Sequence, residues 1–278
     1  TTGNNNTAYG GRALQSNTTG CSSTASGYSS LRCNTTGCDN TAVGREAARA
    51  TTTGHRNVSV GACSLYANTT GSNNTVVGFA AGKSNTTADI NVFVGYRTGC
   101  TNTTGIYNSI LGGVAFCSST TASYNASVGY ATLLSTTTGE GNIAMGTNAL
   151  RANTTASNNT GLGREAMRYN TTGACNTAVG AYSLRLNETG DINTAVGTCA
   201  LCANTTGCRS AAFGFQALLK ATTGGFNTGL GTYSLNQTTT GLCNVAVGTE
   251  AMFYNTTGCN NTALGMRSLH CSTTAKFN

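Results

Sequence analysis

The sequence predicts an all-β fold, a parallel β-solenoid (β-roll or β-helix) with one turn for each block of 17 residues. Variants of the motif Asn-Thr-Ala-Val-Gly return every 17 residues from Gly10 to Gly265 without an insertion or deletion. A fixed period of this kind is the signature of repeat architectures. Each block also contains two segments rich in Gly, Asn and Thr, a composition that disfavours a helical repeat. The chain therefore predicts about 16 turns.

The order of elements within a block follows from its consensus. We number the Asn of Asn-Thr-Ala-Val-Gly as position 1 and its Gly as position 5. The first segment and the later Asn-Thr-Thr-Gly segment, at positions 12–15, are expected to form short strands joined by tight turns. All charged side chains fall at positions 6, 7, 10, 11, 13, 16 or 17, so these positions are expected to face outward.

The remaining columns predict the interior. Position 4 is mostly Val or Leu and position 9 is mostly Leu, apart from Gly82 and Gly99, so these two columns are expected to form the core. Position 8 is always Ala, Ser or Thr, small residues that are expected where the neighbouring wall of the solenoid packs closely against the side chain. Because side chains alternate along a strand, Glu188 at position 13 predicts that position 13 faces outward and positions 12 and 14 face inward. Asn at positions 1 and 12 is expected to form hydrogen-bonded ladders.

The blocks fill the whole chain, which predicts one continuous solenoid domain over residues 1–278. Both ends fall within a block and no initiator Met is present, so an interior segment of a longer fibre is expected. One turn alone buries too little apolar surface to offset the entropy of ordering it, which means that the turns are stable only as an array.

Three of the best-kept motifs carry a resemblance to known repeats: Asn40-Thr41-Ala42-Val43-Gly44, Asn176-Thr177-Ala178-Val179-Gly180 and Asn193-Thr194-Ala195-Val196-Gly197. With the Asn-Thr-Thr-Gly segment that follows, the repeat resembles those of phage and viral tail-fibre-like proteins and, more distantly, the head repeats of trimeric autotransporter adhesins. The resemblance implies a left-handed parallel β-roll with a role in surface attachment. The chain departs from those families in its thirteen cysteines.

The period places several cysteines on adjacent turns. Residues 17 apart are expected to stack ~4.8 Å from each other, which lies within the Cα separation that a disulfide accepts. An oxidising compartment would pair such thiols and a reducing one would keep them free and outward-facing. The candidate pairs are Cys21 with Cys38, Cys100 with Cys117, and, on a diagonal, Cys243 with Cys259.

Aromatic side chains occur mainly at outward positions, where an isolated solenoid would expose many rings to water. Lateral packing against other chains in a fibre or homo-oligomer is expected, with glycans or another ligand as the alternative. The candidate packing residues are Tyr28, Phe79, Tyr96, Tyr130, Phe215, Tyr107 and Tyr124.

A basic column at position 10 offers a second outward feature. Arg151, Arg168 and Arg185 occupy three successive turns and could form a stripe for a linear polyanion. Glu165 precedes Arg168 by three residues, so a partly paired and solvated face is the alternative. The net charge is only +7, and nucleic acid is not the expected partner.

Asn-x-Thr sequons are frequent, and they predict a glycoprotein only where the Asn faces outward. Most of them start at position 12, where burial is expected. The outward candidates are Asn5, Asn73, Asn158 and Asn260 at position 17 and Asn236 at position 10.

These features predict a structural or adhesive extracellular fibre protein, on a cell or virion surface. A glycan-binding solenoid module is the alternative, and an ice-binding solenoid with an outward Thr column at position 13 is a second one. No enzyme activity, metal or cofactor is expected, because the two histidines lie far apart and the eight acids are scattered. No apolar run approaches the ~20 residues of a membrane span.

Overall fold

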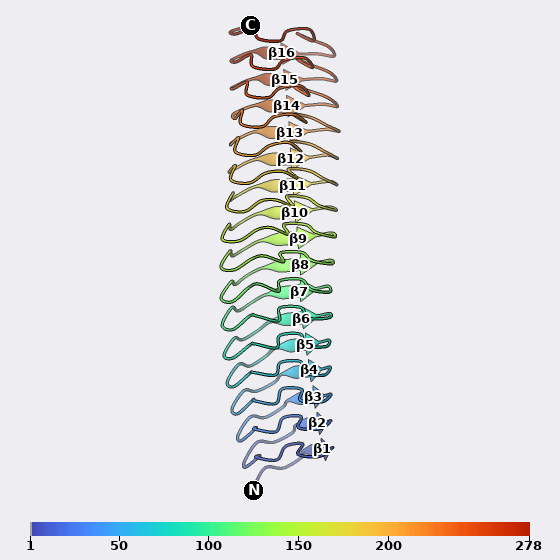
Figure 1. Ribbon diagram of the computed structural model, residues 1–278, viewed down its shortest axis with the longest axis vertical. Helices are drawn as coiled ribbons and strands as arrows, with labels where there is room; N and C mark the ends of the chain where they lie inside the picture. The colour runs from blue at the N-terminus through green and yellow to red at the C-terminus, as the bar shows by residue number, and fades with distance from the viewer. Residues whose placement is uncertain (1) are drawn as a thin grey trace. The chain divides into compact units, whose positions relative to one another are not determined.

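The computed structural model describes residues 2–278, which form two compact units, the first ending at Glu140 and the second comprising Gly141–Asn278. Each unit is a parallel β-solenoid with eight three-residue strands, one in each 17-residue block (Figure 1). The predicted all-β solenoid is therefore confirmed. We call the block that contains strand βn turn n. The strands of the first unit are β1 Thr7–Tyr9, β2 Thr24–Ser26, β3 Thr41–Val43, β4 Val58–Val60, β5 Thr75–Val77, β6 Val92–Val94, β7 Ser109–Leu111 and β8 Ala126–Val128.

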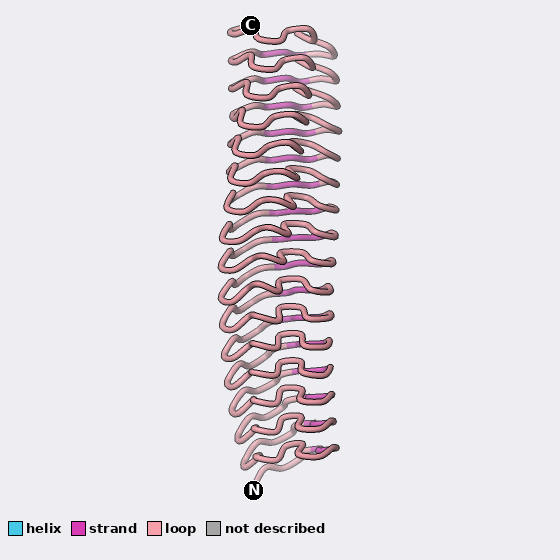
Figure 2. Tube along the Cα trace, in the orientation of Figure 1, coloured by secondary structure: helices cyan, strands magenta, loops and turns pink. Residues whose placement is uncertain are grey.

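The second unit repeats the arrangement. Its strands are β9 Ile143–Met145, β10 Thr160–Leu162, β11 Thr177–Val179, β12 Thr194–Val196, β13 Ala211–Phe213, β14 Thr228–Leu230, β15 Val245–Val247 and β16 Thr262–Leu264. Within each unit every strand pairs in parallel with the next in a register of one block, as in Thr177 with Thr194. The expected second strand at positions 12–15 is absent from the described turns, and loops make up the rest of each turn (Figure 2).

The core lies one residue away from where the apolar columns predict it. Position 3, mostly Ala, is buried in nearly every turn, whereas position 4 is half-buried or exposed, with Leu111 42% and Met145 47% exposed. The prediction that position 4 is a core column is therefore wrong. The reason is strand alternation: Asn at position 1 points inward, so position 3 does too, and positions 2 and 4 point to solvent.

The prediction for position 9 is confirmed, since Leu184 and Leu201 are fully buried. The Leu of position 9 faces the small residue of position 3 across a narrow interior. In turn 6 the bulky Phe93 occupies position 3, and glycines stand at position 9 of turns 5 and 6. A Cβ on Gly99 would lie 2.9 Å from the Phe93 ring, so the two glycines make room for it.

Two successive β-turns connect the strand to the second segment. In turn 3 the N–H of Ala47 donates to the carbonyl of Gly44 and that of Thr51 donates to Ala48, both at 3.2 Å. Gly44 has a φ of +129°, and a Cβ on it would lie 2.7 Å from the carbonyl carbon of Gly61. Glycine is therefore required at position 5 by both conformation and inter-turn spacing.

Positions 13–15 form a bend, which overturns the expectation that position 14 faces inward. In turn 2 the N–H groups of Thr35, Thr36 and Gly37 all donate to the carbonyl of Thr52, at 2.9, 3.2 and 3.3 Å. Strand alternation does not apply to such a bend. Position 14 is consequently exposed in all sixteen turns, next to the partly exposed hydroxyls of position 13.

The predicted asparagine ladders at positions 1 and 12 are confirmed. At position 1, the backbone N–H and Nδ2 of Asn57 donate to Oδ1 of Asn40 at 3.0 and 3.1 Å. At position 12, Nδ2 of Asn187 donates to Oδ1 of Asn170 at 2.7 Å and to the carbonyl of Gly190 at 2.9 Å. These bonds satisfy amides that would otherwise be costly to bury. The Asn of the position-12 sequons is thus buried in most turns.

Two outward expectations are wrong. Glu165 at position 7 is buried, because two arginines enclose it. Asn236 at position 10 is only 2% exposed, and its Nδ2 donates to the carbonyl of Gln216 at 3.0 Å. The four candidates at position 17, Asn5, Asn73, Asn158 and Asn260, are exposed.

Candidate functional site

Two stacked thiols form the most chemically distinctive feature of the first unit. Cys100 in turn 6 and Cys117 in turn 7 both occupy position 10, inside the second β-turn. Their sulfur atoms lie 3.1 Å apart, and the Cys117 thiol donates to the carbonyl of Arg97 at 2.6 Å. Cys100 is only 8% exposed, while Cys117 is half-buried. The structure thus brings this predicted pair together, with all thirteen cysteines as free thiols.

Electrostatics distinguish the two sulfur atoms. When Cys100 is ionised, the Cys117 thiol can donate to its sulfur instead of to the Arg97 carbonyl, and this hydrogen bond lowers the pKa of Cys100. Burial opposes this, but the Arg97 guanidinium adds to it, and the resulting pKa is about 6. The same contact and burial raise the pKa of Cys117. The Cys100 thiolate in turn raises the pKa of Arg97. Cys100 is therefore the member of the pair that ionises.

A cavity of about 350 Å³ adjoins Cys100. Lys83 and Arg97 supply two positive charges to its wall, and Phe79 and Tyr96 supply two rings, stacked at a centroid distance of 5.7 Å. Cys63 from turn 4 also lines it. The cavity therefore combines a thiol of lowered pKa, cations and an apolar surface, and it contains no carboxylate in its wall.

The second predicted thiol pair has a different environment. The sulfur atoms of Cys21 and Cys38, at position 16, lie 2.7 Å apart. The backbone N–H of Cys21 donates to the Cys38 sulfur at 3.1 Å, and that of Cys38 donates to Nδ1 of His55 at 3.0 Å. The hydrogen bond with Cys38 is the main reason that the pKa of Cys21 is raised, and burial and the charge of Asp39 add to it.

A role for column 16 was missed by the sequence reasoning. In about half of the turns, the backbone N–H at this position donates to the side chain one turn later. The backbone N–H of Ser72 donates to Oδ1 of Asp89 at 2.6 Å, and that of Asp191 donates to the sulfur of Cys208 at 3.3 Å. The recurrence of short acceptor side chains (Cys, His, Ser, Asp) in the column was the available signal.

The same role accounts for the third candidate pair. Cys259 accepts from the N–H of Leu242, the residue before Cys243, at 3.3 Å, and its thiol donates to the carbonyl of Thr257 at 3.3 Å. Cys243 is exposed at position 17. Their pairing stays a prediction.

In the second unit, the arginine stripe is partly neutralised. Arg168 and Arg185 lie 3.1 and 2.8 Å from Oε2 of Glu165. Burial raises the pKa of Glu165, but the hydrogen bonds and charges of the two arginines outweigh it and hold the pKa below its ordinary value. Arg185 also stacks over the Tyr169 and Tyr182 rings at 5.7 and 5.5 Å. Arg151 lies one turn from Arg168 and is half-buried.

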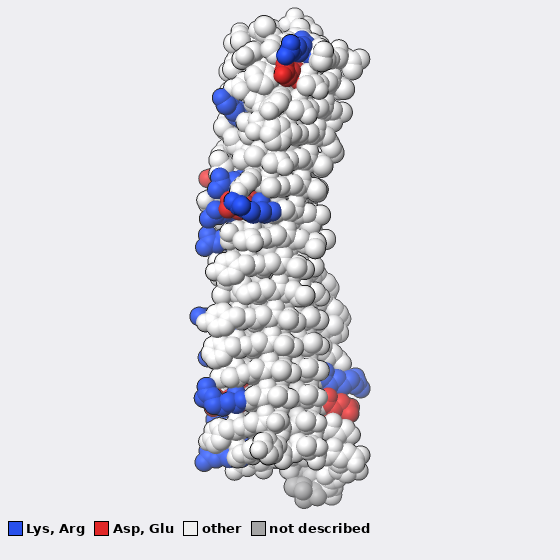
Figure 3. Space-filling model, turned by 90° about the vertical axis from the view of Figure 1, so that its right-hand side faces the viewer, with Lys and Arg blue, Asp and Glu red and all other residues white. Residues whose placement is uncertain are grey.

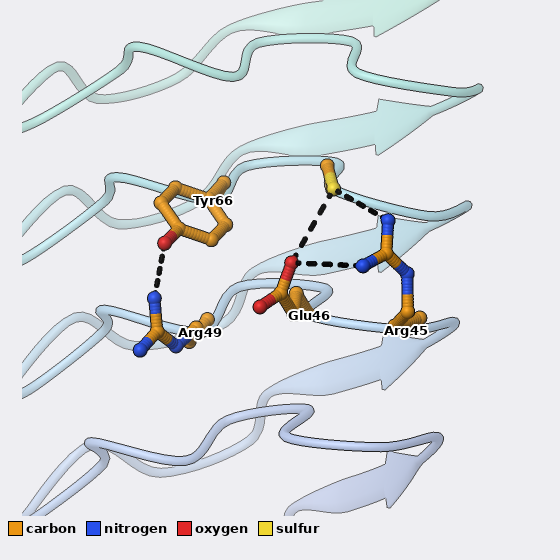
Figure 4. A network of polar contacts seen from close by, with 5 residues as sticks. Arg45, Glu46, Arg49 and Tyr66 are labelled. Carbon is orange, nitrogen blue, oxygen red and sulfur yellow. Dashed lines mark hydrogen bonds and ion pairs between the residues drawn. The ribbon is translucent and has the colours of Figure 1, made fainter.

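Charged groups elsewhere follow the same pattern of local pairing. In the first unit Arg45 lies 3.5 Å from Glu46, and Arg49 donates to the hydroxyl of Tyr66 and stacks over its ring (Figure 4). The visible charges gather in small groups separated by uncharged surface (Figure 3). The face in view (Figure 3) is therefore mostly uncharged, with isolated polar networks.

The predicted lateral-packing aromatics are all exposed. Two sets stack between neighbouring turns of the first unit: Phe79 on Tyr96, and Tyr107 on Tyr124 with ring centroids 5.3 Å apart. In the second unit Phe215 meets Tyr233 edge to face at 5.4 Å. Aromatic rings thus pack against each other between neighbouring turns, and each ring remains partly exposed to solvent. The exposed candidates are Tyr28, Phe79, Tyr96, Tyr130, Phe215, Tyr107 and Tyr124.

Within residues 2–278, no group of three or more His, Cys, Asp or Glu side chains could hold a metal ion. Over the same residues no helix is long and apolar enough to cross a membrane. No model of a known protein family matches the sequence, and no curated protein matches it. Membership of the fibre families that the repeat resembles therefore stays a prediction.

Proposed function

We propose that this chain is a structural or adhesive segment of an extracellular fibre, such as a filament, appendage or tail-fibre shaft, and that it carries out no catalysis. The observation that supports this most is the outward sheet face. Position 4 presents an apolar side chain to solvent in nearly every turn, and positions 2–4 carry no charge anywhere in the chain. A neutral apolar face of this regularity is suited to lateral packing.

The size of the face indicates the kind of assembly. Eight turns at ~4.8 Å and a width of ~10 Å give one unit roughly 400 Å² of sheet face. A stable pairwise interface buries about 800 Å² on each partner. One unit alone therefore falls short, and association is expected to be concentration-dependent and to require several contacts along the fibre.

Electron microscopy of the full chain, together with sedimentation at rising concentration, tests the proposal. Filaments or lateral bundles are expected. Val43→Lys combined with Val128→Lys should abolish them, because both side chains lie on the sheet face at 39% and 45% exposure. The control, Thr36→Lys with Thr121→Lys, puts the same charges on exposed position 14 and should leave assembly intact. Discrete monomers of the unmodified chain would overturn the proposal and favour the glycan-binding alternative.

The resemblance to tail-fibre-like and adhesin-head repeats also supports a fibre at a cell or virion surface. The left-handed sense that it implies remains a prediction. Glycosylation at the exposed asparagines of position 17 is compatible with this location.

Ice binding is a second candidate function, and it is supported by a second column of outward-facing threonines. Position 13 was the one Thr column predicted to face outward, but position 14 is Thr in every turn and exposed throughout. Stacked turns space these hydroxyls by ~4.8 Å. Thermal hysteresis in a solution of the chain is the expected result, and its loss on replacing Thr70, Thr87 and Thr104 by Lys would assign it to this column. Absence of hysteresis in the unmodified chain eliminates this candidate.

A further inference from the structure

Cys100 and Cys117 differ from the other stacked thiols in what their sulfur atoms do. The sulfurs of column 16, such as Cys38, accept a backbone N–H and so complete the inter-turn bonding. In column 10 the most frequent residue is arginine, and an adjacent pair of cysteines occurs there once. Cys100 instead lies beside Arg97 and lines the cavity with Lys83. Cys117 contacts the backbone as a donor to the Arg97 carbonyl, and the N–H-accepting role of column 16 therefore does not account for this pair.

We propose that Cys100 and Cys117 form a thiol–disulfide exchange site, in which Cys100 attacks a small anionic disulfide bound in the adjoining cavity and Cys117 resolves the adduct. The two positive charges of Lys83 and Arg97 favour an anionic ligand, and the Phe79–Tyr96 stack provides an apolar surface for its carbon chain. Glutathione disulfide has this chemistry and is the probe. The inference does not depend on the proposed fibre function.

The reaction balances with this one co-reactant. The Cys100 thiolate, having lost its proton to solvent, attacks one sulfur of the small disulfide, forming a mixed disulfide and releasing one thiolate, which takes up a proton. Cys117 then gives up its proton and attacks the Cys100 sulfur. The Cys100–Cys117 disulfide forms and the second small thiol leaves. Two protein thiols are oxidised and one disulfide is reduced to two thiols.

The geometry allows both steps. The sulfur atoms are already 3.1 Å apart, and adjacent turns keep Cα atoms at ~4.8 Å, within the range that a disulfide accepts. The ionisable groups facing Cys100 are Arg97, Lys83, Tyr96, Cys63 and Cys117, and none is a carboxylate. The product would join turns 6 and 7 covalently within the first unit.

The pair Cys21–Cys38 serves as an internal control, because its sulfurs are also close, 2.7 Å apart, but Asp39 replaces the arginine as the nearby charge. At about pH 6 an ordinary thiol is ~0.3% ionised, whereas Cys100 is about half ionised. The lower basicity of the thiolate reduces its intrinsic nucleophilicity by roughly tenfold, which leaves a net advantage of about tenfold.

The experiment exposes the reduced full chain to glutathione disulfide at about pH 6, quenches with acid and maps disulfides by peptide mass spectrometry. Cys100–Cys117 should oxidise about tenfold faster than Cys21–Cys38. Cys117→Ser should accumulate a glutathione adduct on Cys100, and Cys100→Ser should give no comparable adduct on Cys117.

Arg97→Gln should reduce the rate advantage, because it removes the positive charge beside Cys100, whereas Arg12→Gln, at the same position 7 in turn 1, should not change it. Circular dichroism of each variant establishes that the solenoid persists. Equal rates for the two pairs, an adduct on Cys117 in place of Cys100, or an unchanged rate in Arg97→Gln would each overturn the proposal.

Discussion

Replacing Ala221 by asparagine should stabilise the second unit. In the position-12 ladder, Nδ2 of Asn204 donates to Oδ1 of Asn187 at 2.6 Å. The ladder stops at the next turn, where position 12 is Ala221, and Oδ1 of Asn204 is buried without a hydrogen-bond partner. An Asn at 221 would place its Nδ2 where the neighbouring turns place theirs, within reach of this oxygen and of the carbonyl of Gly224.

The magnitude follows from the groups involved. A buried polar atom without a partner costs about 1–3 kcal/mol, and each added hydrogen bond contributes about 0.5–1.5 kcal/mol. Ordering the new side chain opposes this by about 1 kcal/mol. The new Oδ1 faces Thr238, whose hydroxyl can donate to it. The Ala221→Asn chain should therefore be more stable by about 1–2 kcal/mol.

Chemical denaturation of the full chain, followed by circular dichroism, measures the change, and hydrogen exchange locates it in turns 12–14. Ala203→Asn is the matched control, since position 11 of turn 12 is half-buried and belongs to no ladder. An Ala221→Asn chain no more stable than the original, or no more stable than Ala203→Asn, would refute the claim that the open Oδ1 destabilises this turn.

Three further predictions address the core, the spacing and the electrostatics. Leu201→Ala at buried position 9 should destabilise by about 2–5 kcal/mol, whereas Leu230→Ala at exposed position 4 should cost under about 1 kcal/mol, as measured by denaturant unfolding. Gly197→Ala should destabilise by more than about 2 kcal/mol, because φ is +134° and a Cβ would lie 2.4 Å from the Gly214 carbonyl oxygen. Gly113→Ala should be near neutral, because its Cβ would make only an ordinary van der Waals contact, 3.7 Å from the Tyr130 ring. The lowered pKa of Glu165 means that its ionised form stabilises the fold above the ordinary value of 4.5, and that this contribution disappears as the pH falls below it. Glu165→Gln should therefore be less stable at about pH 7 and converge with the original chain as the pH falls through the lowered pKa of Glu165, in unfolding curves measured from neutral to acidic pH.

The period alone was enough to predict the coil, the asparagine ladders and the buried Leu column, because each depends on residues 17 apart being neighbours. It misplaced the other half of the core, because hydrophobicity favours Val over Ala while the narrow interior admits only a small residue opposite Leu. A compensating signal was present in the sequence: Phe93 at position 3 coincides with Gly82 and Gly99 at position 9. That coincidence shows the two columns facing each other.

The bend at positions 13–15 escaped prediction for a different reason. Alternation is a property of strands. Here the N–H groups of the three residues after Asn34 converge on the carbonyl of Thr52, and this bend turns both threonines outward.

The candidate site could be predicted only in part from the sequence. The stacking of Cys100 on Cys117 follows from the period, and so does that of Lys83 on Cys100 in the cavity wall. The hollow itself and the approach of Arg97 to Cys100, three residues further along the same turn, depend on side-chain conformations that the period does not specify.

The turns of this chain are nearly identical. A position that keeps the same residue type from turn to turn is one that the solenoid fold requires, and a position where the residue varies is one that the fold does not constrain. Column 16 tolerates Cys, Ser, Asp and His because any short acceptor can satisfy the same N–H, so a thiol there requires no redox role. Column 10 has no such requirement, and its side chains differ from turn to turn, as in Arg49, Lys83, Cys100 and Phe253. Specific chemistry in this molecule should therefore be sought on the outer β-turns. The sheet face and the threonine bend, which change least, are suited to assembly or to a repetitive ligand.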